Sequence, residues 1–329
     1  MVRLPPLVAE VSSRSNRAGR FDVATVDSLN RHCQIVTRRL GTGSVVPFLG
    51  AGANLCERPA DTDWEAGYLP SGAELAEFLA APYGYPEADL DLLRVAQWVD
   101  LVSSPRALAD ELHAVFSRDY RPNKVHRFLA ELPQRLREEG QRVCGQLVLT
   151  TNYDDVLERA FLETGEPVDV VVYEARGNEQ RFVHLRPDGE RVAIDDPARY
   201  REFALEQRSV ILKIHGDVDR DDSDHDTFVV TEDHYIDYLA RERVRALIPA
   251  YLMRRIRESD LLFLGYSMRD WNLRVILRQI WAEQGVSTGG WSIQRSPSEV
   301  DLRFWARQRI EILDVPLEDW VDAMLEQRR

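Results

Sequence analysis

Short apolar runs alternate with amphipathic segments along most of the chain. Strands are predicted where apolar or β-branched residues follow one another, at 45–49, 146–150, 168–173, 209–214, 228–230, 261–265, 291–294 and 310–315. Helices are predicted where apolar residues recur every three or four positions, at 26–40, 73–116, 125–136, 155–163, 232–239, 247–258, 272–284, 297–307 and 317–326. Pro47 weakens the first strand, because proline cannot donate to a sheet ladder. The alternation predicts an α/β fold with a mainly parallel sheet and helices on both faces.

The same pattern suggests how the chain is divided. Residues 1–40 are polar with weak periodicity, and we interpret them as an N-terminal arm that leads into a helix. Residues 41–329 form the main domain, with a helical insertion at about 72–140. The polar stretch at about 174–208 is interpreted as a second insertion with a small hairpin.

Composition narrows the class of protein. A hydrophobic content of 44% and a charged content of 29% are ordinary for a globular protein, and we find no apolar run long enough to cross a membrane. The first residues lack a secretory signal, and the three cysteines are widely spaced, at positions 33, 56 and 144. An odd number of scattered thiols fits a reducing compartment, so a cytoplasmic protein is expected.

The net charge of −13 argues against strong nucleic-acid binding, which depends on basic side chains that neutralise phosphates. The arginines at 241–257 are interpreted as the solvated face of a helix. An acidic chain can still bind an anionic ligand, because backbone amides at helix starts hold phosphates.

Small or polar turns follow several of the predicted strands, and parallel strands bring such turns together at one edge of the sheet. Gly50, Ala51 and Gly52 follow the first strand and would let a backbone approach a pyrophosphate, although such a turn can also be purely structural. Asn152 follows the second strand and could orient a water or a sugar hydroxyl. Asp154 or Asp155 could simply cap the next helix.

His215 ends an apolar strand just before a glycine. An isolated histidine of this kind is often a satisfied core residue, but its position at the same sheet edge as Asn152 favours catalysis. A fourth turn, after the strand at 261–265, contains Gly265, Ser267, Asp270 and Asn272, and either of the last two could be a helix cap.

These four turns, in this order, resemble the sirtuin-like NAD+ hydrolases of bacterial anti-phage defence systems. The matching motifs are Gly-Ala-Gly, Thr-Thr-Asn-Tyr-Asp, Lys-Ile-His-Gly and Gly-Tyr-Ser-x-x-Asp-x-Asn, spread over about 45–325. The resemblance implies a Rossmann-like sheet and NAD+ as substrate. It implies that Asn152 and His215 are catalytic. It also implies a set of NAD+-binding residues: Gly50, Ala51, Gly52, Asp154, Gly265 and Ser267. It gives no defined role to Asp270 and Asn272.

The chain departs from true sirtuin deacylases, which carry two Cys-x-x-Cys pairs that bind a structural zinc. It has three cysteines and no such pair, so an all-cysteine zinc site is excluded and no metal is expected. Residues 53–59 also lack the Gly-Ile-Pro-Asp-Phe-Arg segment of the deacylase family. We therefore expect an NAD+ glycohydrolase that releases nicotinamide and ADP-ribose. The alternatives are an NAD+-dependent protein deacylase without zinc and a non-catalytic subunit that binds NAD+ or ADP-ribose.

The resemblance also implies how activity is controlled. An unregulated NAD+ hydrolase would kill its host, so gating by a homo-oligomer or by a partner protein is expected. A HerA-type ring ATPase is favoured as the partner, with a short Argonaute complex second. Direct membrane binding is not expected.

Overall fold

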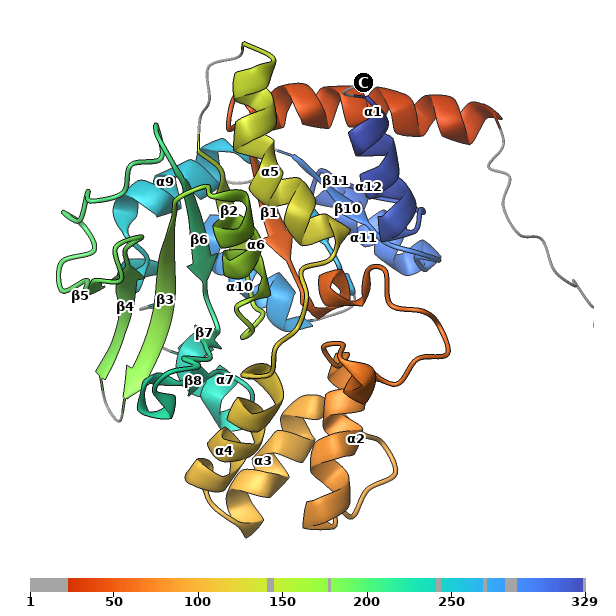
Figure 1. Cartoon of the computed structure of the whole chain (residues 1–329). Helices are drawn as coiled ribbons and strands as arrows, with labels where there is room; N and C mark the ends of the chain where they lie inside the picture. Colours follow the sequence, from red (N-terminus) through yellow and green to blue (C-terminus); the bar gives the residue numbers. More distant parts are fainter. Residues whose placement is uncertain are drawn as a thin grey trace, which may run out of the picture.

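The computed structural model describes residues 23–140, 145–176, 179–240, 244–268, 271–281 and 289–327. Within these residues one nine-stranded sheet has the order β11-β10-β9-β1-β2-β6-β3-β4-β5, with helices on both faces (Figure 1). The parallel strands are β1 (Val45–Leu49), β2 (Leu147–Thr150), β3 (Val168–Arg176), β6 (Ser209–Lys213), β9 (Asp260–Leu264), β10 (Gly290–Ile293) and β11 (Ile310–Leu313). The predicted Rossmann-like α/β fold is confirmed.

Successive side chains of each strand point to opposite faces of the sheet. In β1, Val46 and Phe48 pack on one face, and Val45 and Leu49 on the other. The first face is covered by α7 (Glu232–Ala240), α9 (Ala250–Glu258), α10 (Trp271–Trp281) and α11 (Glu299–Arg307). The second is covered by α1 (Val23–Gly41), α5 (Lys124–Glu138), α6 (Val156–Thr164) and α12 (Leu317–Glu326). Burial on both faces explains why the strands are almost wholly apolar.

Pro47 weakens the strand prediction at its own position, yet it lies within β1. Pro47 pairs in register with Leu262 of β9, while the ladder with β2 begins only at Phe48. The Leu49 carbonyl accepts a hydrogen bond from Thr151 on the β2 side, so Pro47, two residues earlier, faces that same side. The amide hydrogen that proline lacks would point to a place where the β1–β2 ladder has not yet begun.

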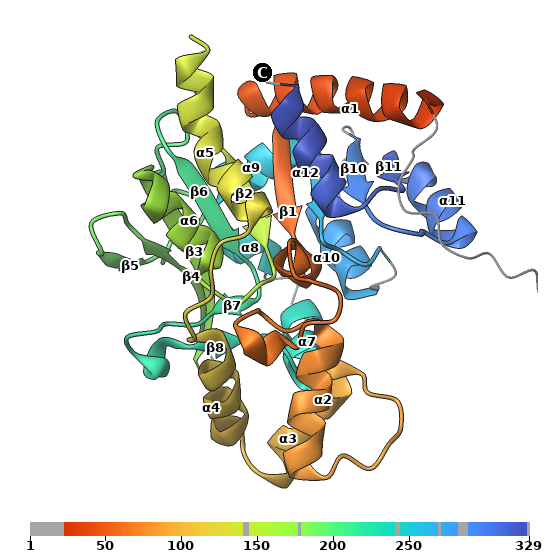
Figure 2. The same ribbon diagram turned by 45° about the vertical axis from the view of Figure 1, so that its right-hand side comes forward.

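Three helices stand apart from the sheet: α2 (Gly72–Tyr83), α3 (Leu92–Val102) and α4 (Pro105–Phe116). This helical group has its own apolar core and lies beyond the carboxyl ends of β1, β2 and β6, whose arrows point towards it (Figures 1 and 2). Each helix is capped at its start by a side chain that accepts a hydrogen bond from a backbone amide of the first turn; these side chains are Ser71, Asp91 and Ser104 respectively. The predicted helical insertion at about 72–140 thus contains the helical group and also α5, which packs on the sheet.

The polar stretch after β3 folds as an antiparallel extension of the sheet. Its strands are β4 (Glu179–Leu185) and β5 (Arg191–Ala193). A second, two-stranded sheet pairs β7 (Gly216–Asp217) with β8 (Thr227–Phe228), and α8 (Val244–Leu247) precedes α9. Three short 3-10 helices complete the elements: η1 (Ala51–Leu55), η2 (Trp64–Ala66) and η3 (Ser223–His225).

Several predicted features lie outside the described residues: the arm over 1–22, Cys144, Asp270 and the end of the helix predicted to residue 284. The division of the chain at residues 40 and 41 stays a prediction. Among the helices of the described segments, none is both long and apolar enough to span a membrane.

Candidate active site

A cavity of about 450 Å³ lies at the carboxyl ends of the central strands. Loops after β1, β2, β6 and β9 form one wall, and the helical group closes the other with Ser71, Gly72, Leu75, Leu92 and Phe116. Ligands of open parallel sheets bind at the topological switch point, where the strand order reverses. Here that point is at β1, because β2 lies on one side of it and β9 on the other. The residues predicted from four separate turns therefore meet around one space, with the exceptions given below.

Asn152 and His215 both line this cavity, so the structure brings together the two residues that the sequence nominates for catalysis. The Asn152 side-chain amide Nδ2 lies 3.3 Å from the Gly50 carbonyl oxygen and 3.5 Å from Asn54 Oδ1, and donates to both. Its backbone amide donates to Thr150 Oγ1 at 3.0 Å. With Nδ2 engaged, the Asn152 Oδ1 is the atom that can accept a hydrogen bond from a molecule in the cavity.

Asp154 holds the Asn152 side chain in place through Asn54. Its side chain is buried, with Oδ2 accepting from Asn54 Nδ2 at 2.8 Å and Oδ1 accepting from the Val156 amide at 3.2 Å. It therefore supplies the helix-capping bond that the sequence left open between two aspartates, whereas Asp155 occupies the capping position without such a bond. The chain of bonds from Asp154 through Asn54 to Asn152 fixes the orientation of the Asn152 carboxamide. Asp154 also lines the cavity, and its contact with NAD+ stays a prediction.

His215 is 4% exposed, and burial lowers the pKa of its imidazole to about 3, so the ring is neutral near pH 7. Nδ1 forms a hydrogen bond of 3.1 Å with the hydroxyl of Tyr235, and the rings of Tyr235 and Tyr238 pack edge-on against the imidazole. Nε2 has no hydrogen-bond partner among the described residues. A buried polar nitrogen without a partner, in the wall of a cavity, is suited to receive one from a ligand.

The glycines of the first and fourth turns bring two loops into backbone contact. Gly52 N donates to the Gly265 carbonyl at 2.9 Å, and a Cβ on Gly52 would lie 2.6 Å from that oxygen. Gly265 has φ +72°, and a Cβ there would lie 1.9 Å from the Ala53 amide nitrogen. Both glycines therefore have a structural role and the Gly52 amide is already engaged, while their contact with NAD+ stays a prediction. Ala51, Gly52 and Gly265 still line the cavity, whereas Gly50 does not.

Of the other residues from the fourth turn, one lines the cavity and two have side chains outside the described residues. Ser267 is exposed and lines the cavity beside Tyr266, whose hydroxyl forms a hydrogen bond of 2.6 Å with Thr151 Oγ1. Asn272 lies in the first turn of α10, but its side chain, like all of Asp270, is outside the described part.

A buried lysine joins the loop after β2 to the strand that carries His215. Lys213 is fully buried, and its Nζ donates to the Asp154 carbonyl at 2.6 Å and to the Tyr153 carbonyl at 3.3 Å. It also forms ion pairs with Glu158, at 2.9 Å, and with Asp217. Burial by itself lowers the pKa of Lys213, but the two carboxylates outweigh it and hold the pKa above its ordinary value. The lysine is charged, and it ties the loop that bears Asn152 to β6.

Asn54, Tyr235 and Lys213 also belong to the site and were not predicted from the sequence. Asn54 lies in η1, which no periodicity predicts, and Tyr235 lies in a helix that begins well after its partner histidine. Lys213 could have been noticed, because a lysine inside an otherwise apolar strand must find buried partners.

The SIR2-like domain model matches residues 146–313, which is just over half of the 329 residues. The chain belongs to the SIR2-like domain family. The matched region includes Asn152, His215 and the loop after β9, while the loop after β1 precedes it.

Two curated relatives match at low identity. NAD(+) hydrolase ThsA of Cytobacillus dafuensis is 24% identical over 230 residues, which are 70% of this chain and 37% of that protein. Defense-associated sirtuin 2 of Bacillus subtilis is 23% identical over 284 residues, which are 85% of this chain and 24% of that protein. The chain thus spans well under half the length of these relatives.

A solved structure of cytosolic 5′-nucleotidase IIIB bound to cytidine covers 93% of both chains at 10% identity, with a TM-score of 0.33 that supports no conclusion. In the described segments no group of three or more histidine, cysteine, aspartate or glutamate side chains is placed to hold a metal ion.

Proposed function

We propose that this SIR2-like domain is an NAD+ glycohydrolase, which splits NAD+ and water into nicotinamide, ADP-ribose and a proton. The observation that carries the proposal is the meeting of Asn152 and His215 in one cavity, each with a polar atom left for a ligand. The names of the two relatives, an NAD(+) hydrolase and a defense-associated sirtuin, agree with it. Membership of the SIR2-like family supports it as well.

The lining of the cavity suits a ligand whose ends differ in character. Asp154 is its one charged lining residue in the described chain, and Leu75, Leu92 and Phe116 of the helical group supply apolar side chains. The pyrophosphate would lie against backbone, near Ala51 and the start of α2, where amide groups and the helix dipole favour anions. The nicotinamide ribose would lie between Asn152 and His215.

The reaction needs no general acid, because nicotinamide leaves as a neutral molecule when the C1′–N bond breaks. What the site must supply is a positioned water and stabilisation of the ribosyl cation. The Asn152 Oδ1 accepts a hydrogen bond from the water that attacks C1′. The neutral His215 imidazole makes its bond to a ribose hydroxyl through Nε2, while Tyr235 holds Nδ1.

Substitution of the two residues tests the assignment. We expect Asn152→Ala and His215→Ala to lower the rate of nicotinamide release by about 10²- to 10⁴-fold, the usual effect of losing a positioned catalytic group. Nicotinamide and ADP-ribose are separated by chromatography after incubation with NAD+. Asn30→Ala and His225→Ala remove the same side chains away from the cavity and should keep the wild-type rate. Wild-type rates in folded Asn152→Ala and His215→Ala proteins would refute the assignment.

We propose further that the enzyme acts in defence against phage by depleting NAD+, and that assembly gates it. The support is the name of the Bacillus subtilis relative and the greater length of both relatives. Sizing the protein alone and with its genomic neighbour, with nicotinamide release measured on each fraction, tests this. A fully active monomer would contradict gating by assembly. An acetyl-lysine peptide added with NAD+ separates hydrolysis from deacylation.

A further inference from the structure

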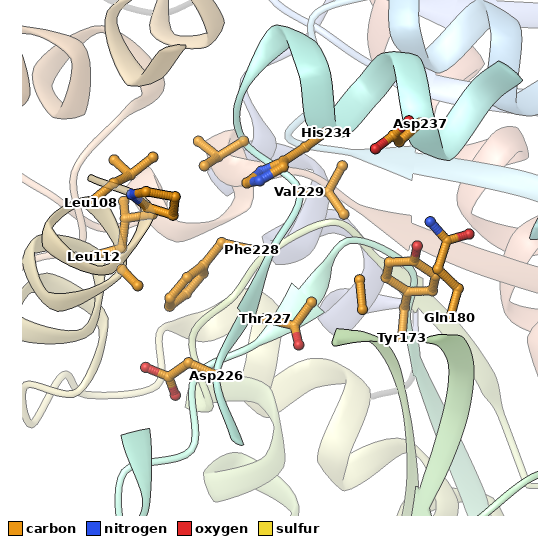
Figure 3. Close-up of a pocket in the computed structure, with 14 residues that line it drawn as sticks. Leu108, Leu112, Tyr173, Gln180, Asp226, Thr227, Phe228, Val229, His234 and Asp237 are labelled. Atoms are coloured by element: carbon orange, nitrogen blue, oxygen red, sulfur yellow. The ribbon is translucent and has the colours of Figure 1, made fainter. Parts of the chain in front are cut away.

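A second cavity, of about 420 Å³, lies on the other side of the polypeptide that supports His215. It is enclosed by α4, α7, the segment 226–230 and the β3–β4 hairpin, and it shares no lining residue with the first cavity. In Figure 3, Leu108, Leu112 and Phe228 lie on one side, Tyr173 and Gln180 on the other, and Thr227 between them. Its volume is within the range of about 300–1,000 Å³ that is usual for small-molecule sites.

The lining of this second cavity selects a ligand by charge. Apolar groups come from α4 and from Phe228 and Val229, which suits a flat apolar body. The acidic groups are Asp237 and Asp226, of which Asp226 is bonded to His113 at 2.8 Å, and no lysine or arginine occurs among the described residues that line the cavity. A phosphate or carboxylate would therefore meet the Asp237 carboxylate and no lysine or arginine, whereas an uncharged or cationic molecule would meet no repulsion.

One polar atom in this wall has no partner. Thr227 is 6% exposed, and its Oγ1 makes no hydrogen bond within the described chain. A buried hydroxyl without a partner costs free energy, so its presence in a cavity wall calls for an explanation. A donor or acceptor on a bound molecule supplies one.

The segment after Thr227 also forms part of the support of His215. The Val229 amide donates to the His215 carbonyl at 2.9 Å, and the Val229 carbonyl accepts from the hydroxyl of Tyr153 at 2.7 Å. Tyr153 lines the first cavity and Val229 the second. The backbone at position 229 is thus a shared wall, bonded to the catalytic site on one side and facing the second cavity on the other.

Helix α7 also contacts both His215 and the second cavity. Tyr235 and Tyr238 pack against the His215 ring, while His234 and Asp237 line the second cavity (Figure 3). A molecule that shifts α7 or the segment 227–230 therefore shifts two of the supports of the imidazole. Tight packing transmits such a shift, because an interior without voids does not absorb it.

We propose that the second cavity binds a small aromatic molecule that is uncharged or cationic and carries no phosphate or carboxylate, and that its occupancy regulates the His215 site. The effect on turnover rests on the proposed NAD+ hydrolysis, whereas binding and charge selectivity do not. Thr227 supplies the hydrogen bond that orients the molecule.

Tethered probes test the charge selectivity. Ala109→Cys places a thiol in the cavity wall, and Ala114→Cys places one on the exposed side of the same helix as a matched control. Each is treated with benzyl, trimethylammonium-ethyl or sulfonatoethyl methanethiosulfonate, and labelling at that position is followed by mass spectrometry. Relative to Ala114→Cys, we expect the anionic reagent to label Ala109→Cys about tenfold more slowly than the other two. Equal relative rates would overturn the proposal.

The benzyl adduct tests the regulatory part. With Ala109→Cys labelled, nicotinamide release should change by about threefold or more, while the Ala114→Cys adduct keeps its unlabelled rate. An unchanged rate in the folded Ala109→Cys adduct overturns the regulation. If the wild-type chain does not cleave NAD+, the proposed function fails, and NAD+ affinity then replaces turnover as the readout, while the labelling ratios still decide the site. Thr227→Val should leave Tm unchanged or higher, because the hydroxyl lacks a partner; a lower Tm means a structural role and contradicts its assignment to a ligand.

Discussion

Replacing Lys213 by methionine should be far more costly than its size suggests. The side chain is fully buried, and the substitution leaves the carboxylates of Glu158 and Asp217 without their cation and the Asp154 carbonyl without the bond from Nζ. Removing one partner of a buried ion pair costs about 3–5 kcal/mol, because the remaining charge stays buried. With an unfolding entropy of about 2.1 cal/mol/K per residue over 329 residues, this lowers Tm by roughly 4–7 °C.

The matched control is Lys124→Met. Lys124 also forms an ion pair at 2.9 Å, with Asp322, but both side chains are partly exposed. Such pairs contribute about 0–1 kcal/mol, so this substitution should move Tm by no more than about 1–2 °C. Thermal unfolding is followed by circular dichroism, and nicotinamide release is measured on the same samples below the transition.

The double substitution Lys213→Met with Asp217→Asn separates charge from packing. Removing the carboxylate charge together with the ammonium should restore part of the lost stability, because less charge is left unpaired. Activity should stay low, since the tie between Lys213 and the loop that carries Asn152 is still missing. The reasoning is wrong if Lys213→Met and Lys124→Met lower Tm equally.

Three further predictions concern the same region and its acid sensitivity. Tyr235→Phe should lower kcat for nicotinamide release about five- to tenfold, the value of one hydrogen bond. KM should change little, because only the 3.1 Å bond that orients His215 is lost and the ring that lines the cavity is kept; an unchanged kcat would exclude this positioning role. Gly265→Ala should destabilise the chain by more than about 2 kcal/mol and abolish activity. Gly84→Ala, at a similar φ but with open space around it, should cost about 1–2 kcal/mol. Urea unfolding compares the two variants, and equal costs would show that the contact between Gly265 and the β1 loop is unimportant. Stability should also fall on acidification below about pH 6.5. Burial lowers the folded pKa values of His32, His126 and His215 well below that of an exposed imidazole, so the unfolded chain binds more protons than the folded one. Each of the three lowers the free energy of unfolding by up to about 1.4 kcal/mol per pH unit. Urea midpoints that stay constant between pH 7 and 5 would contradict this.

The parts of the fold that follow from period and composition were predictable. β1 and α12 have the bounds that the apolar pattern predicts, since a strand buried on both faces and a helix buried along one side leave a clear trace in the sequence. The place of Pro47 within β1 was not predictable, because its tolerance depends on where a neighbouring strand starts to pair, which no local pattern shows. The strand predicted at 228–230 coincides with β8 only at Phe228, and β7 was missed, because strands of two residues carry no period.

The candidate site was predictable for residues that end strands, and not for those that support them. Asn152 and His215 follow apolar runs, so the topology alone places them at one edge of the sheet. Asn54 and Tyr235 reach the same space from elements whose positions depend on tertiary packing. The glycines at 52 and 265 show a further limit, because the sequence indicates that a backbone must come close to something without saying to what.

The cavity is lined by residues from Ala51 to Ser267, and β1, which carries the first of its loops, lies in the middle of the sheet with β9 as one neighbour. A polypeptide still emerging from the ribosome has no β9 until residue 264 has been added. Until then the glycine contact between the two loops cannot form, and no dinucleotide-sized space exists. The order of synthesis thus keeps the proposed NAD+ hydrolase inert until β9 has been made.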